Sequence, residues 1–347
     1  MASILQQTYP WTSQPLIANG PMAGFAGPEL ATAITKAGGL GFIGAGYDLA
    51  PLPSQFKQAK ATLSTHPSSQ NGSKLSIGIG FLCFACSLDD AVAVVKEHQP
   101  VAVWLYATKQ LSDYGTWANA MRNVSDAKIW VQTGSVADAV KISEICRPDT
   151  LVVQGSDAGG HGLEKGAGVI ALLPETADAM SAAGMGDVPL MTAGGIVDGR
   201  GVAAALVLGA AGVVMGTRFL ASSEITNSAY QKVVLAGKDG GQNTTRSKIF
   251  DELRSGGNPW PVEYDGRGLV NASVEDFRKG MSLEENRRLF GEAANGRDGG
   301  LGEERRRVTV WAGTGVGLVN EVKPAGEIVA EVRSEAVKVI EGMKARL

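Results

Sequence analysis

One of the three histidines in the chain lies in a setting that suits proton transfer. His161 belongs to the glycine-rich segment QGSDAGGHG, which starts at Gln154 at the end of a short apolar run. An imidazole titrates near neutral pH, and flanking glycines leave room for a flat ligand. His161 is therefore the candidate catalytic residue, the alternative being a loop histidine that only hydrogen-bonds to backbone. His66 and His98 are interpreted as surface residues.

Two short glycine-containing turns have the pattern of a phosphate site. Gly194 and Gly195 follow one apolar run, and Gly216 and Thr217 follow the next one. Backbone N–H groups at two neighbouring strand ends can form a nest for an anion. Glycines that only permit tight turns would give the same pattern. The two turns together predict a phosphate site, and the sequence contains no P-loop or clear dinucleotide-binding fingerprint.

Other residues at the ends of apolar runs could contact a ring. The segment Asn19-Gly20-Pro21-Met22 could set a thioether and rigid backbone against an aromatic ring, or simply form a turn. Gln132 and Gln154 could bind the edge of a ring or cap the strand ends. Cys83 and Cys86 lack a second ligand pair, so we interpret them as buried thiols and predict no metal site.

Eight apolar runs, each followed by a helical pattern, are expected to position these residues. The runs are continuous rather than alternating, which is typical of parallel strands buried on both faces. This rhythm predicts an α/β fold of the (β/α)8 TIM-barrel type, with an open doubly wound sheet as the alternative. The eighth helix is expected over Ser222–Leu235. The expected strands are Pro15–Asn19, Leu40–Gly44, Leu75–Gly80, Val101–Leu105, Lys128–Gln132, Thr150–Gln154, Val188–Thr192 and Gly212–Met215.

The segment between residues 238 and 307 differs in composition from the rest. It is polar, glycine-rich and basic, with short helices expected at Val274–Met281 and Leu283–Phe290. We predict a barrel made of residues 1–237 and 308–347, with 238–307 inserted as a helical and loop cap. A surface extension without a role in the site is an equal alternative. The apolar segment Trp311–Val319 is expected to pack near the barrel mouth, and an amphipathic helix is expected over Pro324–Met343.

Composition narrows the classes of function. The chain has 347 residues, 44% of them hydrophobic, and a formal charge of −3. This excludes a disordered chain and offers no positive field to attract nucleic acid or an anionic membrane. No apolar run reaches the roughly 18 residues of a membrane span, and no secretory signal pattern is present, so a cytoplasmic location is expected. The final Ala345-Arg346-Leu347 resembles a peroxisomal address, with a chance ending as the alternative.

Three motifs taken together resemble the nitronate monooxygenases, formerly called 2-nitropropane dioxygenases. The motifs are NGPMAGFAG, QGSDAGGHG and TAGGIVDGRGVAAALVLGAAGVVMGTRFLASSE. The resemblance implies a TIM barrel that holds FMN non-covalently and a catalytic base at His161. The phosphate would lie on the glycines of strands seven and eight, and Gly80 could offer only backbone where the family often has Asn or Thr. The implied cofactor-binding residues are Asn19, Gly20, Pro21, Met22, Gly80, Gln132, Gln154, Gly159, Gly160, Gly194, Gly195, Gly216 and Thr217.

The resemblance also implies a reaction. An alkyl nitronate, and in some cases a neutral nitroalkane, would be oxidised by O2 to a carbonyl compound and nitrite, with the flavin carrying the redox step. Two alternatives stay open at this point. One is an FMN-dependent enoyl-thioester reductase that uses NAD(P)H, and the other is a non-catalytic flavin-binding barrel. The sequence indicates neither the physiological substrate nor the oligomeric state.

Overall fold

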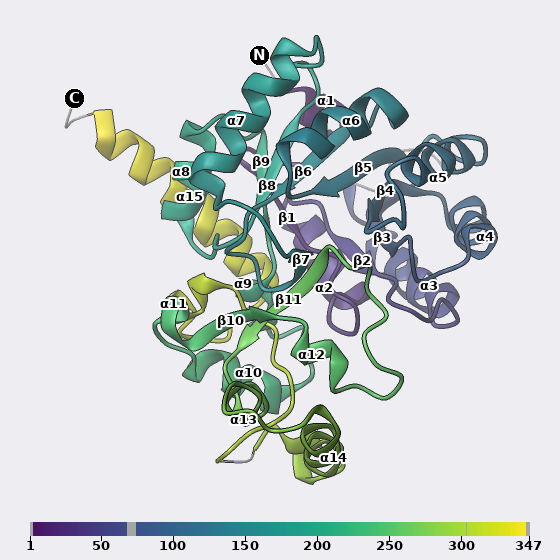
Figure 1. The fold of residues 1–347 in the computed structure, drawn as a ribbon. Helices are drawn as coiled ribbons and strands as arrows, with labels where there is room; N and C mark the ends of the chain where they lie inside the picture. Colours follow the sequence, from purple (N-terminus) through teal and green to yellow (C-terminus); the bar gives the residue numbers. More distant parts are fainter. Residues whose placement is uncertain (1–2, 68–73, 303, 345–347) are drawn as a thin grey trace.

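A closed barrel of eight parallel strands forms the centre of the molecule (Figure 1), in a computed structural model that describes residues 3–67, 74–302 and 304–344. The strand order is β1-β9-β8-β6-β5-β4-β3-β2, and a parallel bridge between Ala18 and Leu40 returns β1 to the segment before β2. The predicted TIM barrel is confirmed. Its strands are β1 (Leu16–Asn19), β2 (Phe42–Gly44), β3 (Leu75–Leu82), β4 (Pro100–Tyr106), β5 (Lys128–Thr133), β6 (Thr150–Gln154), β8 (Leu190–Ala193) and β9 (Gly212–Met215).

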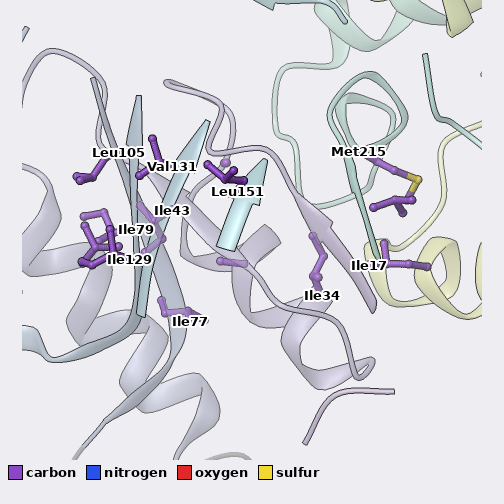
Figure 2. Close-up of a cluster of buried hydrophobic side chains, with 14 of the residues drawn as sticks. Ile17, Ile34, Ile43, Ile77, Ile79, Leu105, Ile129, Val131, Leu151 and Met215 are labelled. Carbon is purple, nitrogen blue, oxygen red and sulfur yellow. The ribbon is translucent and has the colours of Figure 1, made fainter. Parts of the chain in front are cut away.

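The strands are apolar throughout because each one serves two cores. On β4, Trp104 packs inside the barrel with Phe42 and Trp130, whereas Val103 and Leu105 face the surrounding helices. Figure 2 shows part of this outer layer, in which side chains from several neighbouring strands lie together. Neither face of a strand meets water, so the sequence shows no polar alternation.

Seven helices follow the strands in the expected order around the barrel in the described part of the chain. Several begin at a capping side chain: Ser135 accepts a hydrogen bond from the Asp138 N–H, and Asp198 accepts from the N–H groups of Arg200 and Gly201. The helices are α2 (Pro28–Lys36), α3 (Leu52–Leu63), α4 (Leu88–His98), α5 (Asp113–Arg122), α6 (Val136–Cys146), α7 (Val169–Ala182) and α8 (Gly199–Val207).

The eighth helical position is filled differently from the prediction. The helix after β9 comes in two pieces, α9 (Thr217–Leu220) and α10 (Ser228–Ala236), and α10 packs in a side cluster with Val310 and Val316. The C-terminal helix α15 (Ala325–Lys344) instead packs against both α8 and α2. It takes this place because its apolar side, which includes Ile328 and Val332, joins the outer barrel core.

A second sheet, absent from the sequence prediction, lies beside the barrel. Its antiparallel order is β10-β11-β7, and β7 (Gly160–Leu163) carries His161 opposite Gly266. The other strands are β10 (Thr244–Ser247) and β11 (Tyr264–Leu269). The predicted boundaries at 238 and 307 stay a prediction, but this pairing ties the segment to the loop after β6.

The remaining elements are short or peripheral. The helix α1 (Ile4–Thr8) brings Leu5 and neighbouring Tyr9 into the interior barrel cluster, where Tyr9 accepts a hydrogen bond from Trp130. The others are α11 (Gly240–Asn243), α12 (Ile249–Glu252), α13 (Ala272–Arg278), α14 (Leu283–Ala294), η2 (Arg297–Gly300) and η3 (Thr314–Leu318). Within the described ranges, none of the helices has the length and apolar character needed to cross a bilayer. The Ala345-Arg346-Leu347 ending, which resembles a peroxisomal address, lies outside the described residues.

Candidate active site

A cavity of about 440 Å³ opens where the barrel strands end at their carboxyl side. It is lined by residues at, or just after, the carboxyl ends of all eight barrel strands, including Trp104 and Tyr106 of β4. Thirteen of the fourteen residues predicted for the site lie on its wall. They are Gly20, Pro21, Met22, Gly80, Gln132, Gln154, Gly159, Gly160, His161, Gly194, Gly195, Gly216 and Thr217.

Asn19 is placed differently from the other predicted residues. It does not line the cavity, and its side chain is fully buried between β1 and β2. The Nδ2 group donates to the Phe42 carbonyl at 2.8 Å, and Oδ1 accepts from the Phe42 N–H at 2.8 Å. The Asn19 side chain therefore links β1 to β2 where the two strands have no backbone hydrogen bonds to each other.

The glycines on the cavity wall are required by space and by backbone conformation. A Cβ on Gly80 would lie 2.4 Å from ring carbons of Pro21, so no larger residue fits there without movement. Gly194 and Gly195 have φ values of +114° and +74°, in the region that favours glycine. Among the described residues, no acceptor takes the backbone N–H of Gly195 or Gly216. Thr217 accepts from the Gly313 N–H at 3.0 Å, and its own hydroxyl proton stays available.

Two glutamine side chains on the cavity wall, Gln132 and Gln154, are fixed by hydrogen bonds. Gln132 accepts a hydrogen bond from the Trp104 indole at 3.1 Å, which fixes its carbonyl, and its NH2 group faces the Tyr106 hydroxyl. Gln154 donates to the backbone carbonyl of His161 at 3.2 Å, and the Tyr106 hydroxyl donates to the same oxygen at 3.1 Å. The two bonds anchor β7 above the barrel.

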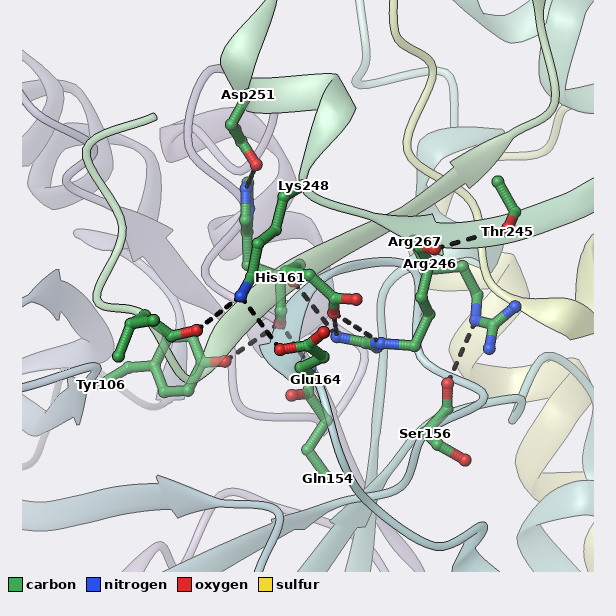
Figure 3. A network of polar contacts seen from close by, with 12 residues as sticks. Tyr106, Gln154, Ser156, His161, Glu164, Thr245, Arg246, Lys248, Asp251 and Arg267 are labelled. Carbon is green, nitrogen blue, oxygen red and sulfur yellow. Dashed lines mark hydrogen bonds and ion pairs between the residues drawn. The ribbon is translucent and has the colours of Figure 1, made fainter. Parts of the chain in front are cut away.

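The His161 ring is held on several sides, and Figure 3 shows its contact with Asp251. Its Nε2 lies 2.8 Å from Oδ2 of Asp251, a carboxylate with only 1% of its side chain exposed. Trp260 stacks on the imidazole with the ring centroids 3.8 Å apart and an interplanar angle of 11°. Trp311 lies at 4.6 Å. The neighbouring Gly160 and Gly162 belong to β7, and these contacts hold the His161 side chain in one orientation.

Burial and charge act on His161 in opposite directions. Removal from water lowers the pKa of the imidazole below its usual value, while the hydrogen bond and negative charge of Asp251 oppose that change. Arg254 and Arg246 contribute smaller effects that lower it further. The ring is thus neutral near pH 7 and able to accept a proton.

Several site residues escaped the sequence analysis. Asp251, Arg254 and Trp260 come from the segment 238–307, and Arg254 and Trp260 line the cavity. The segment thus contributes to the wall of the cavity. An isolated tryptophan in the glycine-rich stretch RSGGNPWP was the one available signal, since a large apolar side chain in such a loop needs a burial site. Trp311 also lines the cavity, as expected for a segment packing near the barrel mouth.

His98 also differs from its predicted place. It stacks on Phe56 with a centroid distance of 4.6 Å, and its side chain is only 14% exposed. Cys83 is buried and Cys86 partly buried, in agreement with the interpretation as buried thiols. In the described ranges, no group of three or more His, Cys, Asp or Glu side chains has an arrangement that could hold a metal ion.

The barrel and its cavity place this chain among the TIM-barrel proteins, whose enzymes carry their active sites at this face. The sequence model of the nitronate monooxygenase family matches residues 117–335. A nitronate monooxygenase of Metarhizium robertsii is 41% identical over 99% of this chain and 97% of its own length. A nitronate monooxygenase of Neurospora crassa is 36% identical over 98% and 94%. The chain belongs to the nitronate monooxygenase family, as the three motifs predicted, and is an oxidoreductase.

Solved structures share the fold at low sequence identity. FabK from Thermotoga maritima matches with a TM-score of 0.76 at 23% identity, with both chains fully covered. Nitroalkane oxidase from Streptomyces ansochromogenes matches with a TM-score of 0.74 at 21% identity, over 98% of this chain and all of the other. These likenesses concern the fold, and family membership implies a flavin cofactor for the cavity.

Proposed function

We propose that this protein binds FMN in the barrel cavity and oxidises alkyl nitronates with O2 to carbonyl compounds and nitrite. The observation that carries the proposal is that thirteen residues from separate strand ends converge on one cavity, with His161 in its wall. Neutral nitroalkanes are proposed as further substrates, because His161 can remove the carbon-bound proton that distinguishes them from nitronates. The protein would need a small-molecule substrate and O2, and no nucleic acid or membrane partner.

The phosphate of FMN would lie at the ends of β8 and β9. The backbone N–H groups of Gly195 and Gly216 are free to donate, and the Thr217 hydroxyl can donate a further hydrogen bond. Gly216 has room above its Cα, since the nearest atom to a Cβ there would be the Met22 sulfur at 3.6 Å. These donors fit a dianionic phosphate, which backbone amides bind without a lysine.

The flavin ring would occupy the apolar part of the cavity above the barrel core. Pro21 and Met22 offer a rigid, polarisable surface, and Gln132 offers an oriented amide for a ring edge. When bound, the flavin supplies the redox step by accepting an electron from the nitronate, and O2 completes the oxidation. The chain's own contributions are a largely apolar cavity, an orientation for the substrate and a base. Arg254 on the cavity wall adds a positive charge that favours an anionic nitronate.

The first test is the absorbance spectrum of the purified protein. We expect flavin bands that persist through gel filtration and a cofactor that, once released by denaturation, co-elutes with FMN. An oxygen electrode should record O2 uptake with ethyl or propyl nitronate, with nitrite as product. A colourless protein that binds no added FMN, or a yellow protein without O2 uptake, would contradict the proposal. The second outcome is the one that a non-catalytic flavin-binding barrel predicts.

An enoyl-thioester reductase is distinguished by its electron donor. Such an enzyme would bleach its flavin on anaerobic addition of NADPH or NADH. We expect no bleaching with either nucleotide and bleaching with an alkyl nitronate under the same conditions. The two additions to one sample separate the two functions.

A further inference from the structure

We infer that Asp251 is a positioning residue for His161: its carboxylate accepts a hydrogen bond from Nε2–H, which keeps the ring proton on Nε2 and leaves Nδ1 as the nitrogen that accepts a proton from the substrate. The inference rests on the proposed oxidation of nitroalkanes and adds a residue to it. Asp251 does not touch the cavity, and no motif in the sequence points to it. It reaches His161 from α12, 90 positions further along the chain.

The geometry decides which nitrogen is available. Asp251 accepts hydrogen bonds only, because its carboxylate has no proton to give when ionised. The 2.8 Å contact with Nε2 therefore requires the proton of a neutral ring to lie on Nε2. Among the described residues, Nδ1 has no hydrogen-bond partner, and it belongs to a side chain on the cavity wall. A lone pair on Nδ1 is what a general base at this wall needs.

The surroundings fix this arrangement. Trp260 covers one face of the imidazole in parallel stacking, and Trp311 approaches at an angle of 56°. The backbone of His161 is held by Gln154 and Tyr106. The ring cannot turn over to exchange its nitrogens without breaking these contacts. The carboxylate is therefore able to select one tautomer of a ring that is already immobile.

The charged groups that act on His161 are its partner Asp251 and two arginines, Arg254 and Arg246. Arg254 Nε lies 3.8 Å from Oδ1 of Asp251, the oxygen that His161 leaves unused, and Oδ1 has no hydrogen bond. Arg246 is paired with Asp265 on the neighbouring strand. Burial lowers the pKa of His161, because the charged imidazolium loses contact with water. The hydrogen bond and negative charge of Asp251 raise this pKa and so offset part of the decrease. Loss of the carboxylate should make His161 a weaker base, so that the acidic limb of its rate profile moves to lower pH.

The tautomer can be measured directly in the wild-type protein loaded with FMN. The chain has three histidines, so a long-range ¹⁵N–¹H spectrum of ¹⁵N-histidine-labelled protein contains three ring systems. His161→Asn removes one of them and thereby assigns it. We expect the neutral His161 ring to carry its proton on Nε2. A proton on Nδ1 overturns the inference, and this readout needs no turnover and no Asp251 variant.

Two variants then test the carboxylate. Asp251→Asn removes its charge and Asp251→Ala removes its hydrogen bond as well. In both, we expect the His161 titration midpoint to fall by roughly 1–3 in pH, the size of effect that a contacting carboxylate typically has. A midpoint that stays in place in both variants overturns the inference. Asp276→Asn is the matched control, because Asp276 is a buried carboxylate of the same segment that pairs with Arg305 and Arg307 and does not line the cavity.

Kinetics with two substrates separate this inference from the proposed function. With a neutral nitroalkane, we expect Asp251→Asn to lower kcat/KM by roughly 10–10²-fold, part of the 10²–10⁴-fold that a positioned base contributes. The acidic limb should move to lower pH, and oxidation of the pre-formed nitronate should keep its rate. Equal losses with both substrates would show a general disturbance of the site and overturn the positioning role. A wild type inactive toward both substrates contradicts the proposed function, while the tautomer spectrum still reports on Asp251.

Discussion

At the scale of single residues, His161 depends on contacts that come from distant parts of the chain. Its backbone is held by Gln154 and Tyr106, its Nε2 by Asp251 and its ring face by Trp260. The segment QGSDAGGHG supplies the histidine, but the protonation state and orientation of its ring are set elsewhere. A substitution at His161 should therefore remove one chemical step without removing the cavity.

The first prediction is that His161→Asn separates the two substrate classes. If the imidazole is a base, oxidation of neutral nitroalkanes should fall by roughly 10²–10⁴-fold, the range typical of positioned proton transfer. Pre-formed nitronates have already lost that proton and should keep a comparable rate. Oxygen uptake with both forms of one nitroalkane measures the difference. If both rates match those of the wild type at equal FMN content, His161 has no catalytic role.

The pair Cys83 and Cys86 gives a second prediction. Both thiols point to backbone carbonyls, and burial raises the pKa of Cys86 to about 11 and that of Cys83 well above its usual value. Protonated thiols are poor nucleophiles and poor metal ligands. The double variant Cys83→Ser, Cys86→Ser should keep its flavin and turnover and lose about 1–2 kcal/mol of stability, because a hydroxyl costs more to bury than a thiol. Stoichiometric metal in the wild type, or loss of turnover in the variant, would refute this.

The site residues predicted from sequence were those next to strand ends. Gly195 and Gly216 could be found because a parallel strand in a barrel delivers whatever follows it to one face. Asp251 and Trp260 could not, since their approach depends on the β7–β11 pairing between segments about 100 positions apart. Asn19 shows the opposite case: it lies at a strand end as predicted, yet its side chain turns inward to Phe42, which its position in the sequence does not reveal.

At the scale of elements, β8 and β9 end side by side and present the turns proposed to hold phosphate. Gly216 is the residue before the short helix α9 and has an ordinary negative φ of −111°. A negative φ does not require glycine, so an aspartate there meets no left-handed backbone strain. Its charge, however, would lie where the phosphate is expected.

The third prediction follows from that conflict. Gly216→Asp should fold normally and purify colourless, because a carboxylate repels the phosphate and occupies its space. Gly216→Ala is the matched variant and should keep part of its flavin, since it adds a methyl group without charge. The flavin-to-protein absorbance ratio and the circular-dichroism spectrum give the two readouts. Full flavin content in the aspartate variant would exclude these turns as the phosphate site.

Long apolar strands and periodic helices were predictable, whereas the elements that join the layers were not. The β7 strand has four residues, GHGL, of which two are glycines with low strand propensity. It is a strand because β11 pairs with it, and no local signal encodes that pairing. The eighth helix was assigned to the nearest helical pattern after β9. The position of the eighth helix in the barrel is filled instead by α15, which starts more than 100 positions later. Its apolar side packs between α8 and α2.

At the scale of the whole molecule, the end of the chain closes the barrel against its beginning. The C-terminal helix α15 packs beside α2, and Arg333 reaches past it to the turn before β1. Its guanidinium donates to the carbonyls of Ala37 and Gly38, at 3.1 and 3.0 Å, just after the end of α2. A cation is well placed at a helix C-terminus, where carbonyls lack partners. This contact lies at the amino-terminal end of the strands, opposite the cavity.

The last prediction uses the separation between the two ends of the barrel. The cavity lies at the carboxyl ends of the strands, whereas the Arg333 contact lies at their amino ends and is expected to affect stability only. Arg333→Met keeps the aliphatic length of the side chain but leaves the carbonyls after α2 without their charged donor. We expect a loss of about 1.5–3 kcal/mol in the free energy of unfolding, as typical of hydrogen bonds to a charged group. The midpoint of urea unfolding, followed by circular dichroism, measures it.

Lys338→Met is the matched control for this variant. Lys338 is exposed on the same helix, and its replacement should change stability by no more than about 0.5 kcal/mol. Both variants should keep wild-type FMN content and the wild-type kcat/KM for nitronates in the absence of urea, because neither residue lines the cavity. An unchanged unfolding midpoint in Arg333→Met would show that packing of α15, rather than its arginine, closes the barrel. Loss of activity without loss of stability would mean that the two faces are coupled.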